Sequence, residues 1–304
     1  MKILFLGSPK TAIPILEKIH KSKHDLVAVI TQSAKPKGRE KKLSKTDIAI
    51  YCHEKNIKTY ESDDINQLFI NEIKDLEFDL AIVVAYGQII PSHILKKSKF
   101  GWINLHYSLL PEFRGAAPVQ WAILKKVLET GITWFQIDEG LDTGPILKQK
   151  SIEIKDFDYS QLINKLNDLA IEDLEEFLNQ IENGTIDKIV QKGDPSFAPK
   201  INEYDLKVDW HQNLENVKSK IKAGNEHLYA WTNFQGQKIK ILNSLGSGED
   251  YLDPGCIQKK SKTVFVGTTS KPLILGDVIP QGKKKMTASD WLNGIQNKEN
   301  LKFE

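Results

Sequence analysis

Cysteine is scarce in this sequence, and long apolar runs are missing. Cys52 and Cys256 are the only cysteines in 304 residues, and they lie far apart. This excludes the disulfide framework of small secreted proteins and a zinc site built from paired cysteines. No apolar stretch approaches the ~20 residues that a helix needs to cross a bilayer. We therefore expect a cytoplasmic protein with no membrane partner.

Arginine is rare, and a glycine-rich nucleotide fingerprint is absent. Arg39 and Arg114 supply the only guanidinium groups among 42 basic side chains. Because a guanidinium offers a planar set of donors that lysine lacks, both positions are candidates for a specific contact. The turn after the first apolar run, Gly7-Ser8-Pro9, lacks the G-x-G-x-x-G spacing of a dinucleotide-binding loop. This counts against NAD or FAD as a cofactor, and so against a dehydrogenase.

Positive charge is concentrated in two segments. Residues 207–304 hold 15 lysines and 10 acidic side chains, a formal charge of +5, whereas residues 1–206 hold 27 basic and 30 acidic ones. Residues 32–46 carry six basic side chains and one acid, and Pro36 and Gly38 predict an irregular loop there. Each segment is either a solvated surface or a contact for an anionic partner such as a nucleic acid.

The first half of the chain alternates short apolar runs with segments of helical period. Predicted strands cover residues 2–6, 26–31 and 78–85, and predicted helices cover residues 10–21, 46–55 and 65–73. Such alternation is typical of a parallel sheet that helices cover on both faces. We predict a Rossmann-like α/β catalytic domain over residues 1–188, with ligands bound beyond the carboxyl ends of its strands.

The last third of the chain follows a different pattern. A predicted helix over residues 159–181 stops at Asn183-Gly184, and residues 189–206 have no clear period and are interpreted as a linker. Beyond it, short alternating segments are separated by Gly, Asn and Ser turns, with two short helices at 213–222 and 287–293. This is typical of a small β-barrel. We expect an OB-like domain over residues 207–304.

Two polar side chains at the end of a predicted strand could catalyse acyl transfer. Asn104 and His106 end the strand predicted for residues 101–105, where the two-residue period points both to one face. An amide can donate a hydrogen bond to an oxyanion, and an imidazole can move a proton near neutral pH. A single histidine is more often structural than catalytic, so this interpretation depends on a third partner.

A carboxylate is expected from the next predicted strand, residues 131–137. This strand leads to Asp138 and Asp142, and we predict that its end joins those of the other strands at one crevice. Asp142 is favoured because glycines flank it in a loop that can bend over a substrate, while Asp138 could instead brace that loop. Since no carboxylate–histidine cluster has metal-ligand spacing, we expect no metal.

Several motifs resemble those of the 10-formyltetrahydrofolate-dependent formyltransferases. Asn104-Leu105-His106, with residues 108–111 and 140–144, matches the motifs that mark this superfamily. The segment Arg114-Gly115-Ala116-Ala117-Pro118 and the basic loop around Lys37-Gly38-Arg39 are similar to those of the branch that formylates initiator methionyl-tRNA. Further similarities run along nearly the whole chain, at residues 5–9, 83–87, 198–201, 209–210 and 281–286.

The resemblance implies a role for each of these motifs. The co-substrate would be 10-formyltetrahydrofolate, with Asn104 donating to the oxyanion, His106 relaying the amine proton, and Asp142 holding His106 and raising its pKa. The folate pocket would be formed by Tyr86, Gly87, Ser108, Leu109, Leu110, Pro111 and Asp138. The contacts to initiator methionyl-tRNA would come from Lys37, Arg39, Lys41, Lys42, Lys283, Lys284 and Lys285. The enzyme would act as a monomer.

Two other interpretations remain open at this point. The same donor could serve a sugar amine or glycinamide ribonucleotide as acceptor. A glycinamide enzyme would lack the second domain, and a sugar enzyme would need neither basic segment. A non-enzymatic folate- or RNA-binding module is a further alternative, against which the intact set of Asn104, His106 and Asp142 argues.

Overall fold

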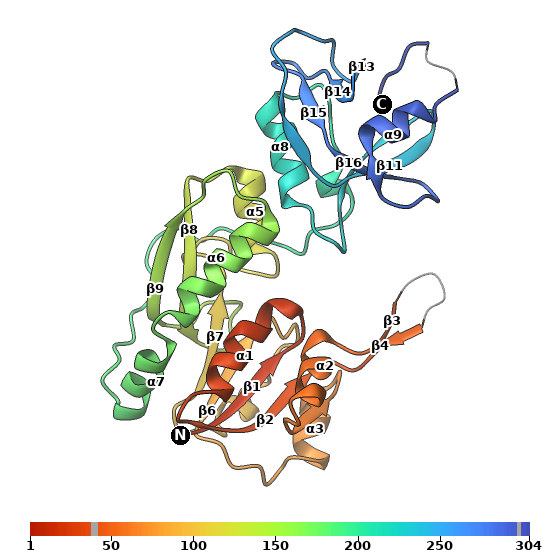
Figure 1. The fold of residues 1–304 in the computed structure, drawn as a ribbon. Coiled ribbons are helices and arrows are strands. Elements are labelled where there is room, and N and C mark those ends of the chain that lie inside the picture. The colour runs from red at the N-terminus through yellow and green to blue at the C-terminus, as the bar shows by residue number, and fades with distance from the viewer. Residues whose placement is uncertain (38–41, 297–298) are drawn as a thin grey trace. The chain divides into compact units, whose positions relative to one another are not determined.

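The computed structural model describes residues 1–37, 42–296 and 299–304 (Figure 1). They group into two compact units. The first comprises Met1–Pro118, Glu129–Glu153 and Ile163–Pro199, and the second comprises Val119–Leu128, Ile154–Leu162 and Lys200–Glu304. Each unit has a hydrophobic core of its own, so each is stabilised by its own burial of apolar side chains.

A seven-stranded sheet, in the order β5-β2-β1-β6-β7-β8-β9, forms the centre of the first unit. Its strands are β1 (Lys2–Gly7), β2 (Asp25–Thr31), β5 (Thr59–Glu61), β6 (Leu80–Val84), β7 (Trp102–His106), β8 (Glu129–Gln136) and β9 (Ile146–Glu153). The first five strands in this order are parallel. All five residues of β6 are buried, as expected for a central strand that helices cover on both faces. The Rossmann-like fold class is thus confirmed.

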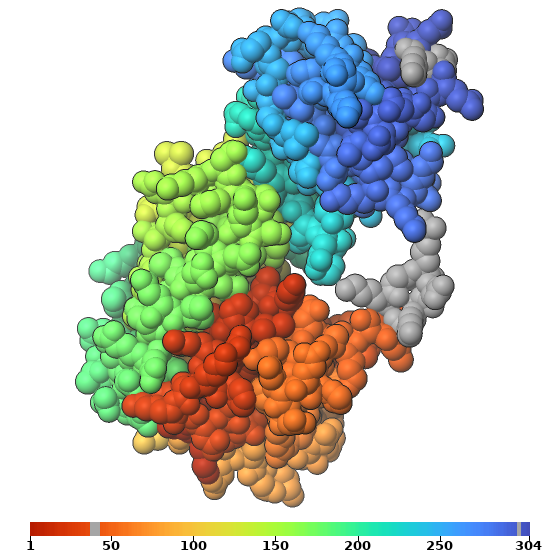
Figure 2. Space-filling view, viewed as in Figure 1, coloured from red at the N-terminus to blue at the C-terminus, as the bar shows by residue number. Residues whose placement is uncertain are grey.

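Helices lie between or after these strands along the chain. They are η1 (Lys10–Ala12), α1 (Ile13–His20), α2 (Asp47–Glu54), α3 (Ile65–Asn71), α4 (Ser92–Leu95), α5 (Pro118–Lys125), α6 (Tyr159–Ile171) and α7 (Leu174–Asn183). Of these, α1 and α2 contact β2. In the space-filling view, the red and orange residues of the N-terminal part form a closely packed surface (Figure 2). Side-chain caps from Thr46 and Asp64 begin α2 and α3, and Gly184, at a φ of 65°, ends α7. The helix predicted for residues 159–181 is in fact two helices, α6 and α7.

One edge of the sheet differs from the prediction. Strand β8 is antiparallel to β7, with His106 opposite Thr133 and Ile103 opposite Gln136. The carboxyl end of β8 therefore lies beside the start of β7, and the direction expected for residues 131–137 was wrong. Strand β9, which the sequence analysis missed, pairs antiparallel with β8 and forms the edge. Its exposed residues are the polar Gln149, Ser151 and Glu153, which alternate with half-buried ones, so it lacks the apolar run of a central strand.

The basic segment at residues 32–46 is more ordered than expected. Strands β3 (Lys35–Lys37) and β4 (Lys42–Ser44) pair as an antiparallel ribbon, in which Pro36 lies opposite Leu43. Proline is tolerated here because each strand of a two-stranded ribbon has an outer edge that needs no amide donor. The prediction of an irregular loop was therefore wrong for these six residues.

The second unit is built from antiparallel strands, as predicted. One four-stranded sheet contains β10 (Ala230–Phe234), β11 (Gln237–Ile241), β16 (Asp277–Pro280) and β17 (Met286–Thr287). The other contains β12 (Ser244–Ser247), β15 (Leu273–Leu275), β14 (Thr263–Val266) and β13 (Ile257–Lys260). Within Lys200–Glu304 the structure has η2 (Tyr204–Leu206), α8 (Leu214–Ala223) and α9 (Ala288–Asn293), so both helices predicted there are confirmed. Trp210, Phe303 and Trp291 stack in the core, with ring centroids 5.3 and 5.5 Å apart.

Candidate functional site

Strand β7 carries Asn104 and His106 on the same face, as the two-residue period predicts. Asn104 pairs with Val83 of β6 and Phe135 of β8, so neighbouring strands fix its backbone on both sides. Its side chain is half-buried, and no hydrogen bond from another described residue engages its amide. This amide is therefore available to a ligand.

His106 is buried between two polar partners. Its Nε2 lies 2.8 Å from the carbonyl oxygen of Phe113, and its Nδ1 lies 3.7 Å from a carboxylate oxygen of Asp142. A carbonyl can only accept, so Nε2 is the nitrogen that carries the hydrogen in the neutral ring. The basic nitrogen is then Nδ1, on the side of Asp142. The structure thus brings together the three residues that the sequence singled out for catalysis.

The pKa of His106 is lowered from its ordinary value of 6.5, and burial is the main cause. The Asp142 carboxylate and the Phe113 carbonyl act in the opposite direction without overcoming burial. The expectation that Asp142 would raise this pKa was right about the partner and wrong about the net direction. A neutral imidazole at neutral pH is the form that can accept a proton.

Stability should depend on pH through this buried ring. Because the folded pKa of His106 lies below 6.5, the unfolded chain binds more protons than the folded one as the pH falls past that value. We expect the free energy of unfolding to decrease between about pH 7.5 and pH 5.5, with His106 contributing on the order of 1 kcal/mol. Urea unfolding at both pH values checks this. His106→Gln should show a shallower decrease, and equal slopes in both proteins would contradict the assignment.

Asp142 reaches His106 through a loop that turns back from the end of β8. Its carboxylate accepts a hydrogen bond of 2.7 Å from the amide of Gly115. Asp138 accepts bonds from the Gly140 amide and the Thr143 hydroxyl, at 3.1 and 2.7 Å, and so braces this loop. The antiparallel direction of β8 makes the return loop necessary, since the strand itself ends at the opposite edge.

Gly115, whose amide binds the Asp142 carboxylate, combines a positive φ with close backbone neighbours. Its φ is +119°, and an added Cβ would lie 2.8 Å from the carbonyl oxygen of Ala198. Gly115→Ala should therefore cost about 1–3 kcal/mol of unfolding free energy and reduce activity, because the amide that holds Asp142 must shift. Urea unfolding measures the first effect. Gly294→Ala is the control, because Gly294 has an ordinary φ and open surroundings, with the nearest atom 3.4 Å away. Equal effects of the two substitutions would contradict this account.

A crevice of about 420 Å³ lies beyond the carboxyl ends of β1, β2 and β6. Strand order reverses between β1 and β6, and ligands in such sheets bind at this switch point. Lining residues include Ser8, Gln32, Lys35, Lys45, Tyr86 and Gly87. The ring of Tyr86, however, is only 2% exposed and belongs to the core, and burial raises the pKa of its hydroxyl. Only the backbone of Tyr86 can serve a ligand, and its carbonyl already accepts from Gln32 at 2.9 Å.

The turn at residues 108–111 is pinned to the antiparallel edge of the sheet. The hydroxyl of Thr133 donates to the carbonyl of Ser108 and accepts from the amide of Leu110, at 2.7 and 3.1 Å. Gln149 donates to the carbonyl of Leu110 at 2.8 Å. The side chains of Ser108 and Leu110 are buried, while Leu109 and Pro111 remain partly exposed. Two of these four side chains can thus reach a ligand, and the other two shape the turn.

The basic residues predicted to contact nucleic acid lie in two places. Lys37 and Lys42 are opposite each other in the β3–β4 ribbon, and Arg39 and Lys41 lie outside the described residues. Lys283, Lys284 and Lys285 are exposed between β16 and β17. Lys285 forms an ion pair of 2.9 Å with Asp277, which raises the pKa of its ammonium group.

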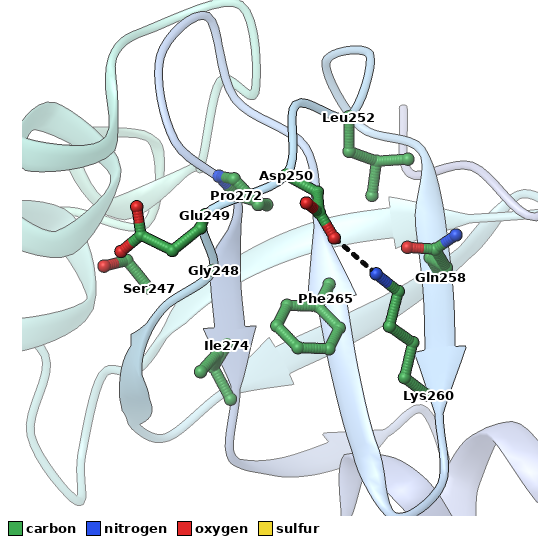
Figure 3. A pocket seen from close by; sticks show the side chains of 10 residues that line it. All are labelled: Ser247, Gly248, Glu249, Asp250, Leu252, Gln258, Lys260, Phe265, Pro272 and Ile274. Carbon is green, nitrogen blue, oxygen red and sulfur yellow. Dashed lines mark hydrogen bonds and ion pairs between the residues drawn. The ribbon is translucent and has the colours of Figure 1, made fainter.

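The second unit contains a smaller hollow of about 240 Å³, which Figure 3 shows from close by. The side chains of Phe265 and Ile274 line it from neighbouring strands. Lys260 forms an ion pair of 2.6 Å with Asp250 across it. The hollow contains none of the residues predicted for catalysis, and its two carboxylates make it a poor site for phosphate.

Sequence reasoning missed a set of contacts to the candidate site from residues 189–198, a segment that we call the strap. The sequence analysis interpreted all of it as linker, but its backbone bonds to Ile146 and to Arg114, and its side chains reach the Asp142 loop. The only signal was the similarity at residues 198–201, which begins at its last residue. A polar side chain in an irregular segment has no period that could reveal its partner.

The described residues contain neither a metal-ligand cluster nor a helix that could cross a membrane. Over the described ranges, no group of three or more His, Cys, Asp or Glu side chains is arranged to hold a metal ion. Every helix in the same ranges is too short or too polar to cross a bilayer.

Comparison with known proteins assigns the chain to a family. It matches the formyl transferase family over residues 1–177 and the formyl transferase C-terminal domain over residues 200–296. The methionyl-tRNA formyltransferase of Corynebacterium glutamicum (strain R) is 36% identical over 315 aligned residues, which cover all of both chains.

Solved structures share the fold at lower identity. An N-formyltransferase from Helicobacter canadensis, in complex with folinic acid and dTDP-3-aminofucose, has a TM-score of 0.67 and 19% identity, covering 90% of this chain and 98% of that one. Methionyl-tRNA formyltransferase from Clostridium thermocellum has a TM-score of 0.58 and 14% identity, covering 91% and 100%. At such identities the likeness shows the fold alone. On the family matches and the full-length relative, the chain belongs to the formyl transferase family.

Proposed function

We propose that this chain transfers the formyl group of 10-formyltetrahydrofolate to the α-amine of methionine esterified to initiator tRNA. The observation that carries the proposal is the set of Asn104, His106 and Asp142 at the end of β7. The acceptor is supported by the full-length similarity to a methionyl-tRNA formyltransferase at 36% identity. The donor is supported by the family and by the folinic acid complex of the structural relative.

The reaction needs an oxyanion donor and a proton relay. The amine attacks the formyl carbon, and the carbonyl oxygen becomes an oxyanion that accepts a hydrogen bond from the Asn104 amide. Nδ1 of His106 takes the proton that the nitrogen loses, while Asp142 at 3.7 Å stabilises the resulting imidazolium. The C–N bond to the folate then breaks, and N10 of tetrahydrofolate receives this proton from His106.

Binding of the donor is assigned to the groups that border the two turns. Gly87 and the backbone of Tyr86 would contact folate on one side, with Leu109 and Pro111 on the other. Ser108 and Leu110 would act through the shape of their turn, and Asp138 through the loop that it braces. The positive φ of Gly87, 80°, supports a close backbone approach at this position.

Binding of tRNA is assigned to the basic residues. Lys37, Arg39, Lys41 and Lys42 would contact the acceptor end, and Lys283, Lys284 and Lys285 would contact phosphates elsewhere. Phosphate contacts of this kind make affinity fall steeply as salt rises. We further propose that the protein acts as a monomer in the cytoplasm, where initiator tRNA is used.

A sugar amine is the alternative acceptor. The structural relative bound to dTDP-3-aminofucose suggests this acceptor, but at 19% identity the similarity shows only a shared fold. The basic ribbon and the +5 charge of residues 207–304 favour a polyanionic acceptor instead.

One assay separates the two acceptors. Purified protein is given 10-formyltetrahydrofolate with initiator methionyl-tRNA, with free methionine, or with a dTDP-amino sugar. We expect formyl transfer to methionyl-tRNA alone, with a rate at low substrate that falls as salt is raised. Transfer to the amino sugar without transfer to methionyl-tRNA would overturn the proposal.

A further inference from the structure

The strap (residues 189–198) is bound to the catalytic unit at both of its ends. Near its start, Ile189 exchanges two backbone hydrogen bonds with Ile146, at 2.7 and 2.8 Å. Near its end, the Ser196 carbonyl accepts from the amide of Arg114 at 2.8 Å, and the Ala198 amide donates to the carbonyl of Arg114 at 2.7 Å. These backbone hydrogen bonds hold the segment between them beside the residues that surround His106.

Gln191 connects the two loops that frame His106. Its amide nitrogen donates to the carbonyls of Asp142 and Gly144, at 2.8 and 2.9 Å. Its amide oxygen accepts from Nε and Nη2 of Arg114, at 3.2 and 2.5 Å. One side chain thus joins the Asp142 loop to residue 114. This also explains why a guanidinium is found at 114, since the contact uses two of its donors.

Ser196 supports the other partner of the histidine. Its hydroxyl accepts a hydrogen bond from the amide of Phe113 at 2.8 Å. Phe113 has a φ of 55°, an unusual conformation for a bulky residue, and its carbonyl is the acceptor for His106 Nε2. Backbone held in such a region needs surrounding contacts to persist, and the strap supplies them.

We propose that Gln191 is a positioning residue for formyl transfer, which sets the distance between the Asp142 carboxylate and the imidazole of His106. This inference rests on the proposed function for its kinetic consequence. Gln191 touches neither His106 nor the crevice residues, so it acts through the Asp142 loop and Arg114. It also lies between the two ranges that match the family, residues 1–177 and 200–296.

A positioning role for Gln191 predicts altered kinetics of the folded enzyme, whereas a purely stabilising role predicts only a change in thermal stability. If Gln191 only stabilised the unit, its loss would lower the midpoint of thermal unfolding and leave the folded enzyme's kinetics alone. If it positions Asp142, its loss displaces the carboxylate from a fully folded site. Burial lowers the pKa of His106 and the Asp142 charge offsets part of that shift, so displacement should lower the pKa further.

Two variants and a control separate these cases. Gln191→Met keeps the length of the side chain and removes every hydrogen bond. Gln191→Glu keeps an acceptor for Arg114 but removes both bonds to the Asp142 loop. We expect each to lower kcat by about 10- to 100-fold, with KM for folate and for tRNA changed by less than about 3-fold. Gln180→Met, on α7 away from the site, should leave all three constants unchanged.

The pKa of His106, measured by NMR titration of the full chain without substrate, separates the two roles. It would not change if Gln191 only stabilised the fold. The His106 resonance is assigned from its loss in His106→Gln. In Gln191→Met we expect a lower pKa of His106 than in the wild type, with circular dichroism unchanged. An unshifted titration, or a kcat that stays within about twofold of the wild type in Gln191→Glu, would overturn the inference. A shifted titration in a protein that does not formylate methionyl-tRNA would instead remove the proposed acceptor and keep the positioning role.

Discussion

Replacing His106 by alanine is expected to lower kcat for formyl transfer by about two to four orders of magnitude. The attacking amine must lose a proton as the C–N bond forms, and Nδ1 of His106 is the basic atom beside the site. Its pKa is lowered by burial, so the wild-type ring is already neutral at neutral pH. Single-turnover rates with saturating substrate measure the chemical step directly. His93→Ala, at an exposed position on α4, should keep the wild-type rate.

The pH dependence of this rate provides a second check. A neutral imidazole is required, so activity should persist below pH 6.5 until the lowered pKa of His106 is reached. His106→Ala should lack this acid limb altogether. A variant that keeps more than about a tenth of the wild-type rate would show that another group or water carries the proton.

The placement of Asn104 and His106 could be predicted from sequence because their geometry is local. Asn104 and His106 are two residues apart at the end of one strand, and strand period alone places them on one face. The parallel part of the sheet was also predictable, since β1, β2 and β6 are short apolar runs between helices of clear period. Both inferences need only information that lies within a few residues of the site.

Asp142 could be identified from the sequence as a candidate site residue, but its position in the fold could not be predicted. Asp142 was expected at the end of a parallel strand, whereas β8 is antiparallel and the loop after it returns to His106. Strand direction depends on which neighbours pair, and this is decided by contacts distant in sequence. The lowered pKa of His106 was missed for a related reason, because burial depends on every element packed around the ring.

The contacts of the strap were even less predictable from local sequence patterns. Gln191 and Ser196 lie in a segment without periodicity, and the partners of their side chains are 47 to 83 residues away. Nothing in the local pattern indicates that Gln191 bonds to the loop of Asp142. Hydrogen bonds from irregular segments satisfy buried backbone groups wherever these occur, so they become visible only in three dimensions.

Asn104→Ala should lower kcat by about two to three orders of magnitude, close to the effect of losing one oxyanion donor in other acyl-transfer enzymes. No described residue bonds to the Asn104 amide, so no structural hydrogen bond is lost with it. We therefore expect unfolding free energy to change by less than about 1 kcal/mol. Kinetics and urea unfolding of the same preparation test both statements, with Asn71→Ala on α3 as the control.

The substitution Asn104→Asp separates an oxyanion donor from a residue that merely fills space. The aspartate has nearly the same shape, but it carries a negative charge where negative charge develops in the transition state. It should be at least as slow as Asn104→Ala, with KM for folate little changed, because the interaction strengthens only as the oxyanion forms. If Asn104→Asp kept the wild-type kcat, shape alone would account for the position, and the oxyanion would have to be stabilised by another donor.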